Sequence, residues 1–184
     1  MDNELWATIK KEITELLLKE PDLANYLSKR ILAHGDLASA MSALLSGKLA
    51  AEDMPAQTLK AVFDEALRTD LSIIETTTKD LLAIRERDPA VKSYSTAILY
   101  FKGFQALQAY RVAHWLWQQE RRGMALYLQS RISEIFGVDI HPAARIGHGI
   151  LLDHATGIVI GETSILEDNI SILQGVTLGG TGKD

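Results

Sequence analysis

The sequence contains no cysteine, which excludes disulfide bonds and thiol chemistry from the fold and the function. It also lacks an excess of basic residues, since 19 Lys and Arg stand against 24 Asp and Glu for a formal net charge of −5 at pH 7. Nucleic acids and anionic membranes both select a basic face, so we expect neither as a partner. The absence of cysteine fits a cytoplasmic protein, and we expect that location.

Long apolar runs are missing as well. The longest uncharged stretch, residues 169–182, is rich in glycine and too short to cross a bilayer as a helix. The N-terminal sequence MDNELWATIKK has neither the basic nor the apolar region of a signal peptide, so we expect none. With 47% hydrophobic residues, the chain has ample apolar content for a packed core. We expect a soluble protein of one or two domains.

Proline is scarce, with four residues in 184, and it marks places where helical patterns stop or start. Apolar residues recur at helical spacing through the first 137 residues. Asp22 and Asp36 are placed to cap helices, and Gly137 is placed to close the last one. The pattern predicts helices over residues 1–20, 22–34, 36–47, 55–67, 70–86, 96–119 and 122–136, with a possible break at Gly103.

Glycine is sparse before Gly137 and frequent after it, and this shift in composition places a domain boundary there. Beyond the boundary, most positions in two series spaced by six are aliphatic, although the polar run 162–169 interrupts the pattern. One series reads Ile140, Ile146, Leu152, Ile158, Ser164, Ile170 and Val176, and the other reads His148, His154, Ile160, Leu166, Ile172 and Leu178. A period of six fits a solenoid of short parallel strands with about eighteen residues per coil.

The sequence therefore predicts a fold of the α + β class, with an all-α domain over residues 1–137 and a β-solenoid over residues 138–184. No Pro- or Ser-rich linker separates the two parts. We thus expect the helices to pack directly on the first coil and to cover its open strand edges. The alternative to the solenoid is a conventional β-rich domain.

Asp153 and His154 form the pair of residues best suited to catalysis. If Leu152 points inward, Asp153 points outward and His154 lies beside it near a corner of the coil. A carboxylate that orients an imidazole lets the ring act as a general base, and Asp139, about one coil below, is a second candidate for the orienting role. The alternative, which the dipeptide alone favours, is that Asp153 and His154 are ordinary surface polarity.

Metal and nucleotide chemistry are poorly supported. His141 is placed in a turn and His148 on a side of the solenoid next to that of His154, so the three do not form the cluster that a zinc site needs. We expect no metal. The segment 176–183 has none of the P-loop order of glycines, so nucleotide hydrolysis is not indicated, although its backbone amides suit a pantetheine arm or a phosphate.

Several long motifs resemble those of bacterial serine O-acetyltransferases. In the helical part they are RDPAV at 87–91, YST at 94–96, KGFQALQAYR at 102–111 and HWLW at 114–117. In the solenoid they are VDIHPAA at 138–144, LDHATG at 152–157 and TLGGTGK at 177–183. The resemblance covers essentially the whole chain. It implies a left-handed parallel β-helix and the transfer of acetyl from acetyl-CoA to L-serine, a step in cysteine biosynthesis.

The resemblance also implies roles for individual residues. His154 is the base that removes the proton from the serine hydroxyl, and Asp139 is the carboxylate that orients it. Asp153, together with Asp88 from a neighbouring subunit, binds the substrate ammonium. A hydroxyl is too weak an acid to attack unaided, and two carboxylates suit a primary ammonium, so these roles make chemical sense.

Further implications concern the co-substrate and the partners. Gly180 and Thr181 match the motif that lines the acetyl-CoA groove, and no metal is implied. L-cysteine is the expected feedback inhibitor and binds at the serine site. The expected assembly is a homotrimer or a dimer of trimers, and full-length relatives also dock into cysteine synthase through a C-terminal tail.

The resemblance runs out at Asp184. Family members continue with further coils that carry an Arg-His pair, the rest of the CoA groove and the docking tail. We therefore expect the chain as given to fold and oligomerise but to show little or no serine acetylation. Two other functions stay open: a hexapeptide acyltransferase for another acceptor, such as an amino sugar, and a non-catalytic oligomerisation module.

Overall fold

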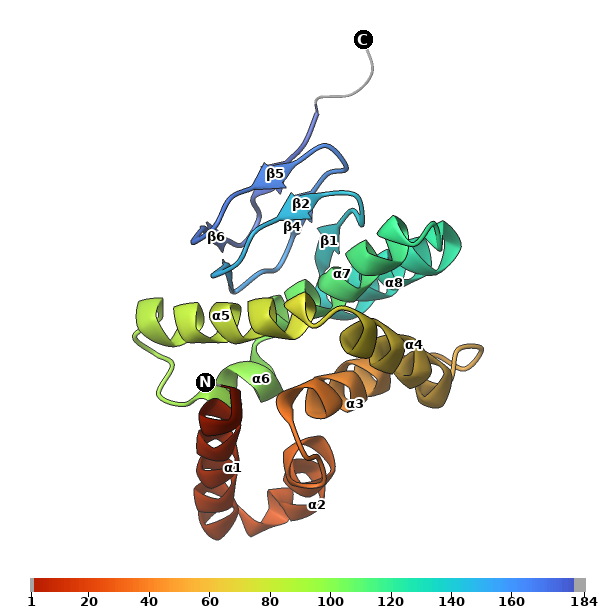
Figure 1. The fold of residues 1–184 in the computed structure, drawn as a ribbon. Coiled ribbons are helices and arrows are strands. Elements are labelled where there is room, and N and C mark those ends of the chain that lie inside the picture. The colour runs from red at the N-terminus through yellow and green to blue at the C-terminus, as the bar shows by residue number, and fades with distance from the viewer. Residues whose placement is uncertain (1, 181–184) are drawn as a thin grey trace.

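Residues 2–180 are described by a computed structural model (Figure 1). The helical elements are α1 (Asp2–Lys19), the 3₁₀ turn η1 (Pro21–Leu23), α2 (Ala24–Leu27), the π-helical η2 (Ser28–Leu32), α3 (Leu37–Leu49), α4 (Ala56–Thr69), α5 (Ser72–Arg87), α6 (Tyr94–Tyr100), α7 (Lys102–Gln118) and α8 (Arg122–Phe136). The strands are β1 (Val138–Ile140), β2 (Arg145–Ile146), β3 (Leu151–Asp153), β4 (Ile158–Ile160), β5 (Ile165–Leu166), β6 (Ser171–Leu173) and β7 (Thr177–Leu178). The strands lie at one end of the molecule, and α1 and α2 lie at the opposite end (Figure 1).

Local signals in the sequence explain several helix ends. The Asp36 carboxylate accepts a hydrogen bond from the Ser39 amide at 2.8 Å, and the Ser39 hydroxyl accepts one from the Asp36 amide at 3.4 Å. This capping box starts α3, as predicted. Bonds from the Ser39 hydroxyl and amide hold the pKa of Asp36 below its usual value. Gly137 ends α8 in the left-handed conformation, with φ of 66°, also as predicted.

The predicted helical segment over residues 22–34 is present as continuous helical structure over residues 21–32, but it is not one regular helix and Asp22 does not cap it. The segment forms three short pieces, because Pro21 opens a 3₁₀ turn that contains Asp22 rather than being capped by it. No side chain caps α2, and η2 continues the chain with π-helical bonds. Leu27 and Ile31 still lie four residues apart, and both are fully buried in the core.

Helix α7 approaches strand β3 very closely at Gly103. The predicted break in the helical pattern occurs at Phe101, two residues earlier than expected, and Gly103 lies within the first turn of α7. A Cβ at this position would lie 2.2 Å from the carbonyl oxygen of Leu152. Glycine is required here because no side chain fits between the helix and the strand.

The strands pair in parallel and stack in coils, which confirms the predicted solenoid. β1, β4 and β7 form one sheet, β2 and β5 a second, and β3 and β6 a third. Val138 pairs with Ile158, an offset of 20 residues, whereas Val159 pairs with Thr177, an offset of 18. The predicted period of about eighteen residues is therefore correct for the second offset and wrong for the first coil.

The two additional residues of the first coil lie in the corner between β3 and β4. Asp153 pairs with Leu173, and Val159 pairs with Thr177. The segment from Asp153 to Val159 is therefore two residues longer than the segment from Leu173 to Thr177 on which it stacks. Because of the insertion, positions of the first hexad series in the first coil stack on positions of the second series in the next coil, and residues of both series face the interior. The buried residues are Ile140, Leu152 and Ile158 from the first series and Ile160, Leu166 and Ile172 from the second.

A buried polar network joins α5 and α7 to the first coil. Asp80 is fully buried and accepts hydrogen bonds from Arg111 Nη2 at 2.7 Å and from the amide of Ile150 at 2.9 Å. Arg111 also donates to the carbonyl of Gly147 at 2.8 Å. The helices thus pack directly on the first coil, and these bonds fix the segment that leads into β3.

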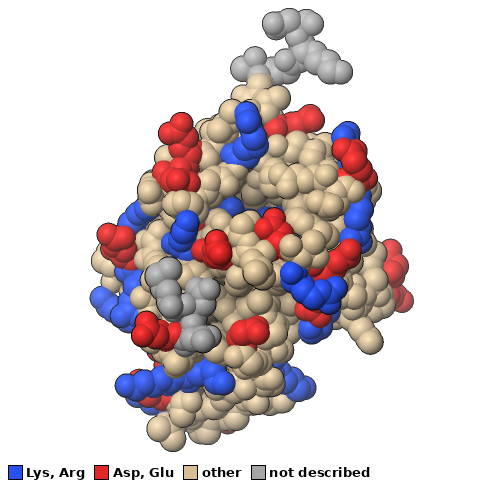
Figure 2. All heavy atoms as spheres, in the orientation of Figure 1, with Lys and Arg blue, Asp and Glu red and all other residues tan. Residues whose placement is uncertain are grey.

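The surface carries charges of both signs. On the face shown in Figure 2, Lys and Arg are interspersed with Asp and Glu and do not gather into one basic patch. Within residues 2–180, no helix combines the length and the apolar character that a membrane crossing requires.

Candidate functional site

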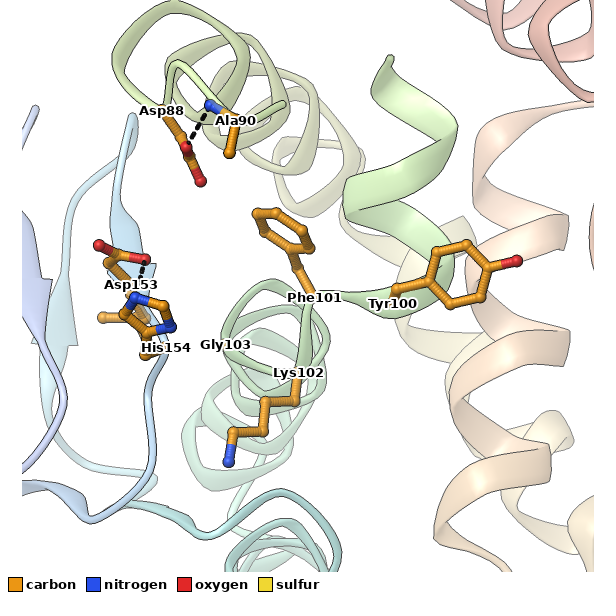
Figure 3. A pocket seen from close by; sticks show the side chains of 9 residues that line it. Asp88, Ala90, Tyr100, Phe101, Lys102, Gly103, Asp153 and His154 are labelled. Atoms are coloured by element: carbon orange, nitrogen blue, oxygen red, sulfur yellow. Dashed lines mark hydrogen bonds and ion pairs between the residues drawn. The ribbon is translucent and has the colours of Figure 1, made fainter. Parts of the chain in front are cut away.

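A cleft of about 420 Å³ opens between the first coil, the end of α5 and the start of α7 (Figure 3). It contains three of the six predicted site residues. Its lining residues are Asp88, Ala90, Tyr100, Phe101, Lys102, Gly103, Leu152, Asp153 and His154. Three predicted site residues, Asp88, Asp153 and His154, therefore lie around one cavity.

Asp153 ends strand β3, and His154 begins the enlarged corner that follows it. The carboxylate Oδ1 of Asp153 lies 3.9 Å from Nε2 of His154. His154 and Ala155 both adopt left-handed backbone conformations, with φ of 55° and 63°, while Ala155 is fully buried. The two-residue insertion thus turns the His154 side chain outward, where it is 76% exposed and open to ligands.

Asp88 closes the cleft from the end of α5. As predicted, the helix ends here because Pro89 follows; one carboxylate oxygen of Asp88 accepts a hydrogen bond from the amide of Ala90 at 2.8 Å. Arg87 donates to the carbonyl of Gly149 at 2.9 Å and so fixes this end of α5 to the first coil. Asp88 of the same chain lines the cleft beside Asp153. The expected contribution of Asp88 from a neighbouring subunit stays a prediction.

Lys102 lies on the remaining wall, in the first turn of α7. Its ammonium donates a hydrogen bond of 2.5 Å to the hydroxyl of Thr156, in the same corner as His154. The analysis of the sequence assigned no role to Lys102. Lys102 reaches this corner because α7 packs closely against β3 at Gly103. In the sequence, the only sign of that close packing was a glycine within a helical pattern.

Asp139 does not line the cleft. Its carboxylate accepts a hydrogen bond from Gln129 Nε2 at 2.7 Å, and it borders a separate hollow along α8. In the strand register of the 20-residue first coil, Asp139 pairs with Val159, which is five residues beyond His154. Among residues 2–180 it makes no ion pair or hydrogen bond with His154, so the expected stacking of the two residues is wrong within one chain.

The other candidate residues lie away from the cleft. Gly180 is exposed at the end of the described chain, and Thr181 lies outside the described residues. His148 pairs with Asp168, whose carboxylate is 3.3 Å from its Nε2, in another part of the coil. In the described part of the chain, no group of three His, Asp or Glu residues is placed to hold a metal ion.

The cleft combines three kinds of polar group in one small volume. Two carboxylates can bind an ammonium group, an exposed imidazole can accept a proton, and a lysine ammonium can bind an anion. Asp88, from the turn after α5, and Asp153, on β3, line adjoining parts of the same cleft, with His154 beside Asp153 (Figure 3). The arrangement suits a small zwitterion that carries a group to be deprotonated.

Comparisons with known proteins agree on one family. Residues 5–109 match the family model described as serine acetyltransferase, N-terminal. The chain is 54% identical over 184 residues to the serine acetyltransferase of Haemophilus influenzae, which covers all of this chain and 69% of the relative. It is 53% identical over 179 residues to that of Escherichia coli, which covers 97% of this chain and 66% of the relative. The chain thus spans about two thirds of these relatives.

Solved structures of serine acetyltransferases have the same fold. The chain matches one in complex with CoA at 54% identity and one in complex with cysteine at 54% identity, each with a TM-score of 0.97. These matches cover 98% and 100% of this chain and 77% and 76% of the solved chains. A soybean enzyme complexed with serine matches at 50% identity and a TM-score of 0.97, covering 100% of this chain and 75% of that one. The predicted fold class is confirmed.

Proposed function

The chain belongs to the serine acetyltransferase family, and we propose that it is a serine O-acetyltransferase that transfers acetyl from acetyl-CoA to the hydroxyl of L-serine. The observation that carries the proposal is the cleft lined by Asp88, Asp153 and His154. The solved relatives named for their complexes with CoA and serine support the same two ligands here. The products are O-acetylserine and CoA.

In the proposed mechanism His154 is the general base. It takes the proton of the serine hydroxyl as the oxygen forms a bond to the thioester carbonyl carbon, whose π electrons move to the carbonyl oxygen. When the tetrahedral intermediate collapses, the carbon–sulfur bond breaks and the imidazolium returns the proton to the CoA sulfur. The exposure of His154, at 76%, supports this role because both substrates must reach the ring.

Asp88 and Asp153 form the proposed ammonium site. One oxygen of Asp88 is held by the Ala90 amide, and its other oxygen faces the cleft (Figure 3). Two carboxylates that line one cleft can bind a primary ammonium between them by charge-assisted hydrogen bonds. L-cysteine carries the same ammonium, so we propose that it competes at this site as a feedback inhibitor, in line with the solved relative in complex with cysteine.

The proposed acetyl-CoA groove includes Gly180, which follows β7, and Thr181, which lies outside the described residues. Gly180 is exposed, and glycines allow a ligand to approach the backbone closely. We also propose a cytoplasmic location, which the absence of cysteine supports.

The test is an acetyl-transfer assay on the 184-residue chain and on an extended chimera. The chimera joins this chain to the residues that follow the matched region in the Haemophilus influenzae relative, since the chain spans 69% of that protein. Released CoA can be followed with a thiol reagent, and the 184-residue chain itself adds no background because it has no cysteine. We expect the chimera to acetylate L-serine in preference to amino sugars. A folded chimera that acetylates another acceptor, or that binds no ligand at all, would reject the proposal.

Asp139→Asn tests the proposed orienting carboxylate. In the extended chimera we expect a lower turnover with little change in serine affinity, because Asn keeps the shape but cannot stabilise an imidazolium. The matched control is Gln129→Ala, which removes the present partner of Asp139 and leaves the charge in place. If Asp139→Asn weakens only the binding of serine, Asp139 is a ligand contact and not an orienting group.

The proposed assembly is a homotrimer or a dimer of trimers. Large apolar side chains on the outside of the coils and on α8 are exposed in the single chain, and an interface would cover them. They are Leu126, Ile135, Val159, Ile165, Ile170 and Leu173. Light scattering at micromolar concentration should give three times the 20.3 kDa chain mass or a multiple of that value. A clean monomer would contradict the prediction.

A further inference from the structure

Arg87, in the last turn of α5, contacts both coils of the solenoid. Its Nη1 donates a hydrogen bond to the carbonyl oxygen of Gly149 in the first coil at 2.9 Å, and its Nη2 donates one to Oδ1 of Asn169 in the second coil at 3.0 Å. A longer contact of 3.4 Å joins Nη1 to the hydroxyl of Ser171. We call Arg87, Gly149 and Asn169 the corner clamp. Because the guanidinium is planar and holds its N–H groups in a fixed fork, the two shorter bonds together fix its orientation.

Gly149 and Asn169 occupy equivalent positions in successive coils. Leu151 pairs with Ser171 in the register of β3 and β6, and each of the two clamp residues lies two positions before one of these partners. Both have left-handed backbone conformations, with φ of 69° and 63°. A Cβ on Gly149 would lie 2.5 Å from Oδ1 of Asn169. Glycine in the first coil therefore leaves room for the asparagine side chain of the second coil to reach Arg87.

The corner clamp connects the two elements that carry the carboxylates of the proposed ammonium site. Asp88 directly follows Arg87, and Asp153 ends β3, which begins two residues after Gly149. Both carboxylates line the same cleft (Figure 3). One primary ammonium can be bound by both only if an oxygen of each lies within hydrogen-bond distance of the same nitrogen. The separation of Asp88 from Asp153 therefore determines how tightly the ammonium is held.

We propose that Arg87 and Asn169 are positioning residues of the serine site and hold Asp88 where an ammonium can also reach the carboxylate on β3. The proposal rests on the proposed function, because it concerns the ammonium site defined there. It also gives a role to the polar run 162–169, which interrupts the period of six and ends at Asn169. The competing role is purely structural: the corner clamp would hold α5 on the coils without affecting the ligand. The two roles differ in whether a change in the clamp acts through Asp88.

The experiment measures the steady-state kinetics of the extended chimera with and without the charge of Asp88. Arg87→Met removes the guanidinium and keeps an unbranched apolar side chain. It is made in the parent chimera and in an Asp88→Asn chimera, where residue 88 has no charge to position. Asn169→Gly removes the amide at a backbone φ of 63° that glycine tolerates, and Asn169→Asp keeps the acceptor oxygen. Thermal unfolding checks that each variant is folded.

Arg85→Met is the matched control. Arg85 lies in the same last turn of α5 as Arg87 but faces α1 and α6 rather than the coils. Its Nη1 is 3.5 Å from Oε1 of Glu12, and its guanidinium carbon lies 4.8 Å from the centre of the Tyr94 ring. The control therefore removes an arginine from the same end of the helix without touching the corner clamp, and it should keep the parent kinetics.

In the parent chimera, we expect Arg87→Met to raise the KM for L-serine by about three- to tenfold, because the ammonium loses part of a charge-assisted contact. The kcat and the KM for acetyl-CoA should change little, because the ammonium contact is the same in the ground state and the transition state. Asp88→Asn should by itself raise the KM for L-serine by about ten- to a hundredfold, and Arg87→Met should then add nothing. Asn169→Gly should resemble Arg87→Met, alone and in combination with it, and Asn169→Asp should resemble the parent.

An equal rise in the KM for L-serine with and without the Asp88 charge would overturn the proposal and leave the proposed function standing. No rise in the parent chimera, or the same rise for Arg85→Met, would do so as well. If Asp88→Asn leaves the KM for L-serine unchanged, the proposed ammonium site fails, and the positioning role of Arg87 and Asn169 fails with it. A folded chimera that acetylates no acceptor rejects the proposed function and this inference together.

Discussion

A His154→Asn variant of the extended chimera is expected to turn over L-serine about 10²- to 10⁴-fold more slowly than its parent, because the reaction then lacks its general base. Asparagine is the best replacement because the backbone at His154 has φ of 55°, a conformation that Asn tolerates better than Ala does. The imidazole is 76% exposed, so its loss removes little packing. Thermal unfolding should therefore match the parent, and the serine concentration at half-saturation should change little. The released CoA thiol gives the rate.

His148→Asn is the matched control for this variant. His148 also lies on the coils beside a carboxylate, with its Nε2 3.3 Å from Asp168, but it does not line the cleft. Its replacement should leave turnover at the parent level. A well-folded His154→Asn protein that keeps near-normal turnover would remove His154 from the mechanism. His154 would then be an exposed polar residue without a role in catalysis.

The solenoid could be predicted because each coil repeats the same steric requirement. One small or aliphatic residue per side must point inward, and that demand appears in the sequence as a period of six. The insertion between Asp153 and Val159 could not be located in the same way. The second series reads His148 and His154 in the first coil and becomes aliphatic only at Ile160, but the first series is still largely aliphatic in the second coil, so the pattern alone does not show which series points inward there.

The same insertion explains why Asp139 was placed incorrectly. A coil of eighteen residues would pair it with Gly157, three residues from His154, whereas the coil of 20 residues pairs it with Val159, five residues from His154. Local caps were predicted well at Asp36 and Gly137 because a capping box and a left-handed glycine are determined by neighbouring residues. The irregularity of the helical segment that follows Pro21 was not predicted, because apolar spacing does not distinguish a regular helix from a series of 3₁₀, α and π turns.

The cleft could not be predicted from the sequence, because contacts between distant parts of the chain form it. Asp153 and His154 are adjacent in the sequence, but Asp88 joins them only because Arg87 and the buried Asp80 fix α5 on the first coil. Lys102 joins them only because Gly103 lets α7 approach β3. Each of these contacts spans about 50 or more residues of sequence, and no local pattern encodes such pairings. The division at residue 137 remains a prediction, since one hydrophobic core cluster runs through both parts.

Asp80→Ala is expected to destabilise the protein by about 3–5 kcal/mol, the usual cost of removing one partner from a buried ion pair. Asp80 has no exposed surface and accepts four hydrogen bonds. They come from Gln108 Nε2 at 3.0 Å, Arg111 Nε at 3.0 Å, Arg111 Nη2 at 2.7 Å and the Ile150 amide at 2.9 Å. Removing the carboxylate leaves a guanidinium that is 8% exposed without its counter-charge, and it leaves the Ile150 amide unpaired. Because Ile150 directly precedes β3, the variant should also weaken serine binding in the cleft.

Urea unfolding at a fixed protein concentration measures this loss, and two variants make the result specific. Lys11→Ala breaks an exposed pair in which the charged atoms are 4.0 Å apart and the side chains are 79% and 62% exposed, so it should change the unfolding free energy very little. The double variant Asp80→Ala with Arg111→Met removes both buried charges and should lose less than Asp80→Ala alone, because no unpaired charge then remains. If Asp80→Ala unfolds at the same urea concentration as the parent, the buried network does not hold α5 and α7 on the first coil. The position of Asp88 beside Asp153 would then depend on Arg87 and on apolar packing alone.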